Sequence, residues 1–156
     1  MLKKTIKKLD AIYKNIGYEA DVDGAYRDEV TTYASVIRKD GEIVTELTGV
    51  VNPEEVDGSH QIAGEIRGII ETLKWCKIHN IQTIRIYYDY LGLYMWATGG
   101  WKAKKKVSIN YVQFMKNNTI KIEWVKIPAH SNYRWNEYAD KLAKETLIKY
   151  ISKGVK

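Results

Sequence analysis

Residues 18–50 read YEADVDGAYRDEVTTYASVIRKDGEIVTELTGV and contain three consecutive segments with the composition of β-strands. The dipeptide Asp40-Gly41 separates the second segment from the third, and Asp-Gly between two such runs is a strong signal for a tight hairpin. We therefore predict an antiparallel meander at the start of the domain. Its three strands are expected over residues 18–24, 31–39 and 42–50.

The rest of the chain alternates between helical and strand patterns. The expected elements, in chain order, are a helix over 60–79, a strand over 82–88, helices over 89–97 and 105–117, a strand over 119–127 and a helix over 135–152. This order predicts an α/β fold with a mixed five-stranded sheet, in which antiparallel strands come first and two further strands are reached through helices. A right-handed crossover through the first long helix would place the fourth strand beside the first.

Composition narrows the class of protein. The chain has 156 residues and a net charge of +6, which favours a polyanionic partner because Lys and Arg release counterions from phosphates. We expect a domain over residues 18–153, preceded by a basic amphipathic extension over residues 1–17. No apolar run reaches the roughly 20 residues that span a bilayer, so we expect no membrane contact. The chain has a single cysteine, Cys76, so it cannot form an internal disulfide, and we expect it in the reducing cytoplasm. We also expect the protein to be a monomer.

Four acidic residues occupy positions that would suit a metal-dependent enzyme. Asp23 ends the first predicted strand and Asp89 ends the strand over 82–88. Open α/β sheets bind ligands at this edge, beyond the carboxyl ends of their parallel strands. Glu65 lies among the apolar positions of the first long helix, and Asp140 lies among those of the last.

Each of these acids also has an ordinary structural explanation when it is considered alone. Asp23 with Gly24 is compatible with a turn, Asp89 with a helix cap, and Glu65 and Asp140 with solvated helix positions. Four carboxylates at one edge of a sheet would repel one another, however, and divalent cations relieve that repulsion. The set as a whole therefore indicates a Mg²⁺ site, with Mn²⁺ as a possible substitute.

The four acids and a C-terminal His…Asn-Glu-x-x-Asp motif together resemble the type 1 ribonuclease H family. The C-terminal motif is carried here by His130, Asn136, Glu137 and Asp140, and the resemblance covers about residues 18–150. The segments IAGEIRGIIETLKW and YYDYLGLYMWATGGWKA look most like a bacterial subgroup whose relatives often carry a viroplasmin-type hybrid-binding module ahead of the nuclease domain.

The resemblance implies an endonuclease that hydrolyses the RNA strand of RNA–DNA hybrids with two metal ions, leaving 5′-phosphate and 3′-hydroxyl ends. By this resemblance Asp23 is shared by both ions, and Asp140 completes the site on the side of the attacking water. Glu65 and Asp89 complete the site on the leaving-group side, and Glu65 also accepts a hydrogen bond from a ribose 2′-hydroxyl.

The resemblance also implies roles around the metal site. The histidine at His130 assists proton transfer or product release, Glu137 helps to release metal and product, and Asn136 shapes the loop. Gln61 lies one turn before Glu65, where it either contacts the minor groove of the hybrid or is simply solvated.

A basic, aromatic segment follows the strand over 82–88. The family often grips the DNA strand here, and the corresponding residues are Trp101, Lys102, Lys104 and Lys105. Alternatively, these lysines form a solvated face and the nearby Trp96 belongs to the core.

Two features depart from the family pattern. Residues 25–29 replace the usual Gly- and Pro-rich turn after the first Asp. Asp21 lies two residues before Asp23, and therefore on the same strand face, where an aromatic is more usual. A fifth acid there would perturb a neighbouring pKa or the metal preference, or it would pair with a lysine.

Other functions are compatible with the same fold. An exonuclease of the DEDD type would need Asp-x-Glu in the first strand, which here reads Asp21-x-Asp23. A transposase-like nuclease would carry larger DNA-binding regions, and a catalytically inactive hybrid-binding module would not need the four acids. The extension over residues 1–17 has three interpretations: an additional hybrid-binding arm, a helix packed on the domain, or an unstructured tail.

Overall fold

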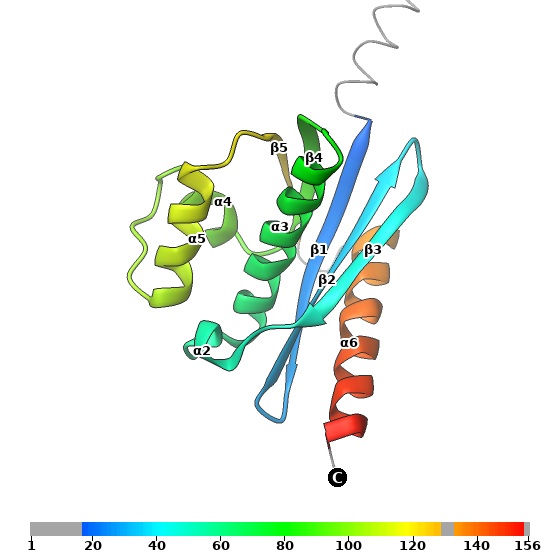
Figure 1. Ribbon diagram of the computed structural model, residues 1–156, viewed down its shortest axis with the longest axis vertical. Helices are drawn as coiled ribbons and strands as arrows, with labels where there is room; N and C mark the ends of the chain where they lie inside the picture. Colours follow the sequence, from blue (N-terminus) through cyan, green and yellow to red (C-terminus); the bar gives the residue numbers. More distant parts are fainter. Residues whose placement is uncertain (1–16, 129–132, 155–156) are drawn as a thin grey trace, which may run out of the picture.

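The protein forms a single five-stranded sheet with helices on both faces (Figure 1). The computed structural model describes residues 17–128 and 133–154. The strands are β1 (Tyr18–Arg27), β2 (Val30–Lys39), β3 (Glu42–Val50), β4 (Thr83–Tyr88) and β5 (Lys121–Lys126). They lie in the order β3-β2-β1-β4-β5, with β1 to β3 antiparallel and β4 and β5 parallel to β1. The predicted mixed sheet, including the contact between the first and fourth strands, is confirmed.

The helices divide between the two faces of the sheet. They are α2 (Pro53–Val56), α3 (His60–Ile78), α4 (Gly92–Ala97), α5 (Lys106–Lys116) and α6 (Arg134–Gly154). Helices α3, α4 and α5 lie on one face, whereas α6 packs on the other, against β1, β2 and β3 (Figure 1). Helix α2 lies in a segment where we expected only a loop; Asn52 caps it, because its Oδ1 accepts a hydrogen bond of 3.0 Å from the backbone N–H of Glu54. No helix within these described ranges is long and apolar enough to cross a bilayer.

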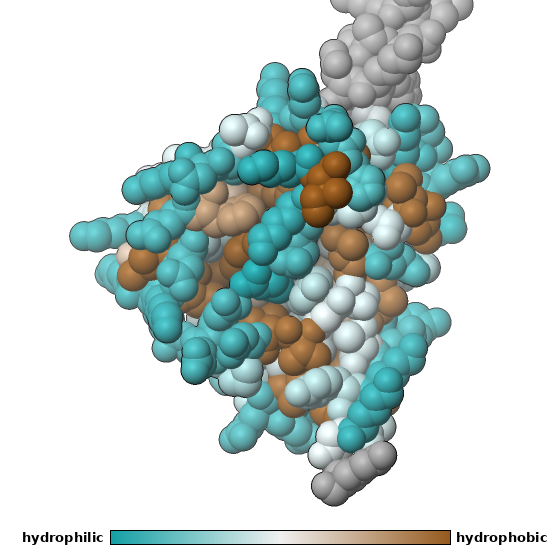
Figure 2. All heavy atoms as spheres, viewed as in Figure 1, coloured by the Kyte–Doolittle hydropathy of each residue, from teal (hydrophilic) through white to brown (hydrophobic). Residues whose placement is uncertain are grey.

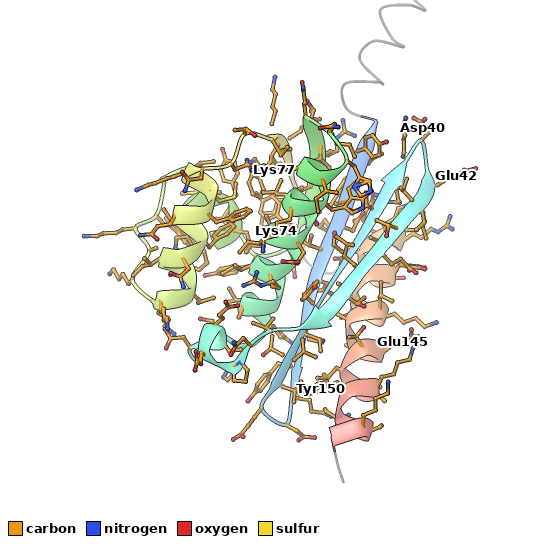
Figure 3. All side chains as sticks on the ribbon, viewed as in Figure 1. Asp40, Glu42, Lys74, Lys77, Glu145 and Tyr150 are labelled. Atoms are coloured by element: carbon orange, nitrogen blue, oxygen red, sulfur yellow. The ribbon has the colours of Figure 1, made fainter. Side chains whose placement is uncertain are left out.

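The main core lies between the sheet and α3. Ile69 and Leu73 of α3 pack with Val22 of β1 and Ile84 of β4, and all four are at most 2% exposed. The opposite side of α3 faces solvent: Lys74 and Lys77 point away from the sheet (Figure 3), within a band of hydrophilic residues along this helix (Figure 2). A smaller cluster of Ala25, Ala34, Ala143 and Leu147 joins α6 to β1 and β2.

Two glycines allow α3 to approach β1 very closely. A Cβ atom on residue 24 would lie 2.9 Å from the backbone nitrogen of Glu65 and 3.0 Å from Cα of Gly64, and closer still to the carbonyl oxygen of Gln61. A Cβ atom on residue 64 would in turn meet Cα of Gly24 at 2.9 Å. Gly24 therefore serves helix–strand packing, and the Asp23-Gly24 pair does not form a turn. The first strand is longer than predicted, because β1 continues past Gly24 to Arg27, which pairs with Val30.

We expect Gly24→Ala to destabilise the domain by about 1–3 kcal/mol, because the added methyl group meets backbone atoms that cannot rotate away. Urea unfolding would measure this loss. Gly154→Ala is the control, since a Cβ atom there meets nothing within 4 Å. Equal stability of the Gly24→Ala variant and the parent would contradict the close packing of α3 on β1.

Candidate active site

The pairing of β1 with β4 brings Asp23 and Asp89 to the same edge of the sheet. The last pair of this parallel ladder is Asp21 with Tyr87, and each of the two acids lies two residues beyond it. Because side chains alternate along a strand, Asp23 lies on the same face as Asp21. Asp89 follows directly after the end of β4 at Tyr88, so it sits where that strand leaves the sheet. The pairing of β1 with β4 thus explains why Asp23 and Asp89 lie at the same edge of the sheet. Asp23 was predicted to end the first strand, but it lies within β1.

Helices α3 and α6 supply the other two carboxylates. Glu65 lies at the point where α3 meets Gly24, and it is only 6% exposed. Its interpretation as a solvated helix residue is therefore wrong. Asp140 is partly exposed on α6, with a side-chain exposure of 43%, next to the buried Ala139.

The charges of the four carboxylates act on one another. Burial is the main cause that raises the pKa of Asp23 to about 7, and the negative charges of Asp140 and Asp89 also raise it. A hydrogen bond of 2.8 Å from the backbone N–H of Gly24 acts in the opposite direction and lowers this pKa. Burial likewise raises the pKa of Glu65 well above its usual value, with further contributions from Asp23 and Asp89. Asp23 thus interacts with each of the other three acids.

The donor set of this site suits a hard divalent cation. All four side chains offer carboxylate oxygens, the ligands that Mg²⁺ and Mn²⁺ prefer, and a cation would relieve their repulsion. Within residues 17–128 and 133–154, no three Asp, Glu, His or Cys side chains are grouped closely enough to hold an ion. Lys144, one turn after Asp140, places its Nζ 2.9 Å from Asp140 Oδ2 and is the cation paired with that carboxylate here.

The remaining residues of the C-terminal motif lie at the start of α6. Glu137 is exposed and Asn136 is half-buried, and they precede Asp140 by about one helical turn. His130 lies outside the described residues, so its role stays a prediction.

A groove of about 870 Å³ opens beside the amino-terminal end of α3. Of the predicted nucleic-acid-binding residues, it brings together Gln61, Trp101, Lys102, Lys104 and Lys105, whereas Asn136 is not part of it. Its lining also includes several residues that we did not predict as binding residues: Ser59, His60, Ile62, Tyr90 and Trp96.

Trp96 shows why the groove was only partly predicted. We weighed it as a core residue, and it does pack against the core, yet its ring also lies 6.2 Å from that of Trp101 and 5.7 Å from that of Tyr90. The close spacing of three aromatics and several lysines was the available signal in the sequence.

Asp21 is paired with an arginine and not with a lysine. Its Oδ1 accepts a hydrogen bond of 2.6 Å from Nη2 of Arg38 on β2. Burial raises the pKa of Asp21 to about 6, although Arg38 acts in the opposite direction. Arg38 was missed in the sequence because its partner lies on another strand.

Comparison with known proteins links this arrangement to one family. The family model described as RNase H matches residues 22–148. Ribonuclease H of Syntrophomonas wolfei is 29% identical over 123 residues, which cover 69% of this chain and 79% of that protein. Ribonuclease H1 of Mus musculus is 32% identical over 94 residues, which cover 52% of this chain but only 33% of the mouse protein. This chain therefore matches about a third of the mouse protein's length.

Solved structures share the fold. The structure of RNase H1 from the halophilic archaeon Halobacterium salinarum superimposes with a TM-score of 0.69 at 20% identity, covering 85% of this chain and 98% of the other. LC11-RNase H1, solved in complex with an RNA/DNA hybrid, superimposes with a TM-score of 0.68 at 15% identity, covering 86% and 99%.

Proposed function

Because the chain belongs to the RNase H family, we propose that it is an endonuclease that hydrolyses the RNA strand of RNA–DNA hybrids. The observation that carries this proposal is the convergence of acidic residues at one edge of the sheet: β1 pairs with β4 just before Asp23 and Asp89, and α3 brings Glu65 against Gly24. The charge of Asp140 on α6 also acts on Asp23. The cleavage would leave 5′-phosphate and 3′-hydroxyl ends.

The position of Asp23 supports a role as the shared metal ligand. The negative charges of Asp140 and Asp89 both raise the pKa of Asp23, and Asp23 in turn raises the pKa of Glu65. Asp140 would bind the ion on the side of the attacking water, and Glu65 and Asp89 the ion on the side of the leaving oxygen. Two bound divalent cations would activate water and neutralise charge on the leaving 3′-oxygen.

The chemistry of α3 supports recognition of RNA at the cleaved strand. A 2′-hydroxyl donates a hydrogen bond that only RNA can supply, and the carboxylate of Glu65 would accept it. Gln61 is exposed one turn earlier and lines the groove, so the same helix can contact the minor groove. In this proposal His130 and Glu137 assist proton transfer and product release, and Asn136 shapes the loop.

The groove supports binding of the uncleaved DNA strand. Trp101 is 39% exposed and offers a surface for a sugar or base, while Lys102, Lys104 and Lys105 surround it with positive charge. The catalytic domain would comprise residues 18–153; residues 1–16 lie outside the described residues, so all three interpretations of the extension over residues 1–17 stay predictions.

A single assay separates this function from its alternatives. The protein is incubated with Mg²⁺ and with internally labelled RNA–DNA hybrid, duplex DNA or duplex RNA, and the Glu65→Gln variant serves as the catalytic control. We expect internal cuts in the RNA strand of the hybrid alone. Digestion from the ends would indicate an exonuclease, cutting of DNA a transposase-like nuclease, and tight binding without cutting an inactive module.

We expect Lys144→Met to lower the Mg²⁺ concentration needed for half-maximal cleavage by about two- to tenfold, because it removes a cation that competes for Asp140. The measurement is a Mg²⁺ titration of the initial rate. Lys141→Met on the same helix is the matched control, since Lys141 pairs with Glu145 and not with a site residue. An unchanged or higher Mg²⁺ requirement would contradict the competition.

A further inference from the structure

A buried ion pair lies on the α6 side of the sheet, next to the proposed catalytic carboxylates. Arg38 Nη2 lies 2.6 Å from Asp21 Oδ1, and the two side chains are 4% and 1% exposed. A second carboxylate, Glu19, lies 3.8 Å from the same nitrogen. In the part of the chain that the structure describes, Asp21 Oδ2 and Arg38 Nε have no hydrogen-bond partner.

Stability alone gives a weak reason for such a pair. Removing two charges from water is costly, and a well-packed apolar pair in place of a buried ion pair often leaves a protein equally or more stable. The two unpartnered atoms add to this cost. The neighbours of the guanidinium group indicate a different role.

Arg38 supports the first turn of α6. Its guanidinium carbon lies 4.5 Å from the centre of the Trp135 ring, and its Nη2 lies 3.5 Å from the hydroxyl oxygen of Tyr133. Tyr133 in turn stacks on Tyr87 of β4 at 5.4 Å. Residues at the start of α6 are thus held against β1, β2 and β4 through this one guanidinium group and its aromatic neighbours.

Asp140 lies between this contact and a second one. Ala143 lies three residues after Asp140 on α6. Its carbonyl oxygen accepts a buried hydrogen bond of 2.8 Å from the hydroxyl group of Thr32. Thr32 and Arg38 both belong to β2, so the same strand holds α6 before and after Asp140. The rise of about 1.5 Å per residue places Trp135 only about 7.5 Å along the helix from Asp140. A shift of the first turn would therefore reach the carboxylate.

We propose that Arg38, with Asp21 as its buried counter-ion, is a positioning residue that sets the distance between Asp140 and Asp23. Asp21 and Asp23 lie two residues apart and therefore on the same face of β1. The ion pair of Arg38 with Asp21 thus connects the start of α6 to the strand that carries Asp23, the proposed shared metal ligand. This inference rests on the proposed function, because it assigns the pair to assembly of that metal site.

The test compares Arg38→Met with Arg85→Met. Arg85 is also an ion-paired arginine on this face of the sheet. It shares Glu19 with Arg38, pairs with Glu123 and donates a hydrogen bond of 3.4 Å to the hydroxyl group of Tyr87, and none of these partners belongs to α6. We expect Arg38→Met to lower kcat on the hybrid about 10- to 100-fold and to change KM by no more than about twofold. Losses of this size are typical when a residue that orients a metal ligand is replaced. Arg85→Met should keep the parent kcat.

A second readout does not depend on turnover. We expect the rise in Tm that Mg²⁺ produces in the parent to shrink in Arg38→Met and to persist in Arg85→Met. If Arg38→Met does not fold, Trp135→Leu tests the same contact and should show the same loss of kcat at the parent KM. A parent kcat and Mg²⁺ response in a folded Arg38→Met or Trp135→Leu variant would overturn the positioning role, whereas a parent protein that leaves the hybrid intact would overturn the proposed function instead.

Discussion

Asp23→Asn is expected to lower kcat on an RNA–DNA hybrid by at least about three orders of magnitude, with KM nearly unchanged. The substitution removes the one carboxylate that interacts with all three of the others, so both proposed ion sites lose a ligand. The hybrid would still bind through the groove around Trp101, which the substitution does not touch. A variant that cleaves at the parent rate would refute the role of Asp23 as the shared ligand.

The same substitution is expected to stabilise the protein when divalent cations are absent. Burial and neighbouring charges raise the pKa of Asp23 from 3.8 to about 7 in the folded state. Between these values the folded state binds more protons than the unfolded state, so Asp23 makes the free energy of unfolding fall as pH rises from about 4 to about 7. Asn carries no such charge. At pH 8 in EDTA we expect the Tm of Asp23→Asn to exceed that of the parent by about 4–8 °C, which corresponds to a gain of about 2 kcal/mol in the free energy of unfolding.

The pH dependence supplies the control for this stabilisation. Below about pH 4 the carboxyl group is protonated in both states, and the difference in Tm between Asp23→Asn and the parent should shrink toward zero. Asp28→Asn, at an exposed position in the turn after β1, should show no comparable gain at pH 8. Mg²⁺ should raise the Tm of the parent more than that of Asp23→Asn, because ligands that bind only the folded state stabilise it. A lower Tm of Asp23→Asn at pH 8 would contradict the crowding of charges at this site.

Replacing Lys102, Lys104 and Lys105 together by Gln is expected to raise KM for the hybrid about 10- to 100-fold, with kcat nearly unchanged. These side chains line the groove beside Trp101, where they would bind phosphates of the DNA strand. The slope of log KM against log salt concentration should also fall by about two to three, roughly one for each phosphate that is no longer neutralised.

The matched control for this triple variant is the replacement of Lys77, Lys116 and Lys121 by Gln. These three lysines are exposed and none of them lines the groove, while the change in net charge is the same. The control should keep a salt slope close to that of the parent. Equal effects of the two triple variants would show that net charge, and not the groove, determines binding.

The parts of this structure that follow from short-range patterns were predicted from the sequence. A short apolar run over residues 82–88 located β4 before Asp89, and helical spacing placed Glu65 on the core-facing side of α3. The parallel pairing of β1 with β4 then brings Asp23 and Asp89 to one edge, as the order of elements required. Lys144 follows Asp140 by four residues, so its ion pair was also within reach of helical periodicity.

The parts that depend on packing between distant segments were not predicted. Asp-Gly in the sequence resembled the end of a strand, and only the approach of Gly64 explains why Gly24 lies within β1. The partner of Asp21 is an arginine on β2, which is set by strand register and burial and not by any local pattern.

The attachment of α6 to β2 has a consequence for the order of events during synthesis. Asp23, Glu65 and Asp89 precede Asp140 along the chain, and Thr32 and Arg38 have already emerged on β2 by the time the ribosome reaches α6. Domains generally fold as units, and all five strands leave the ribosome before α6, which carries the fourth carboxylate. The nascent chain is therefore expected to be unable to cleave an RNA–DNA hybrid until its last helix docks and brings Asp140 to the other three carboxylates.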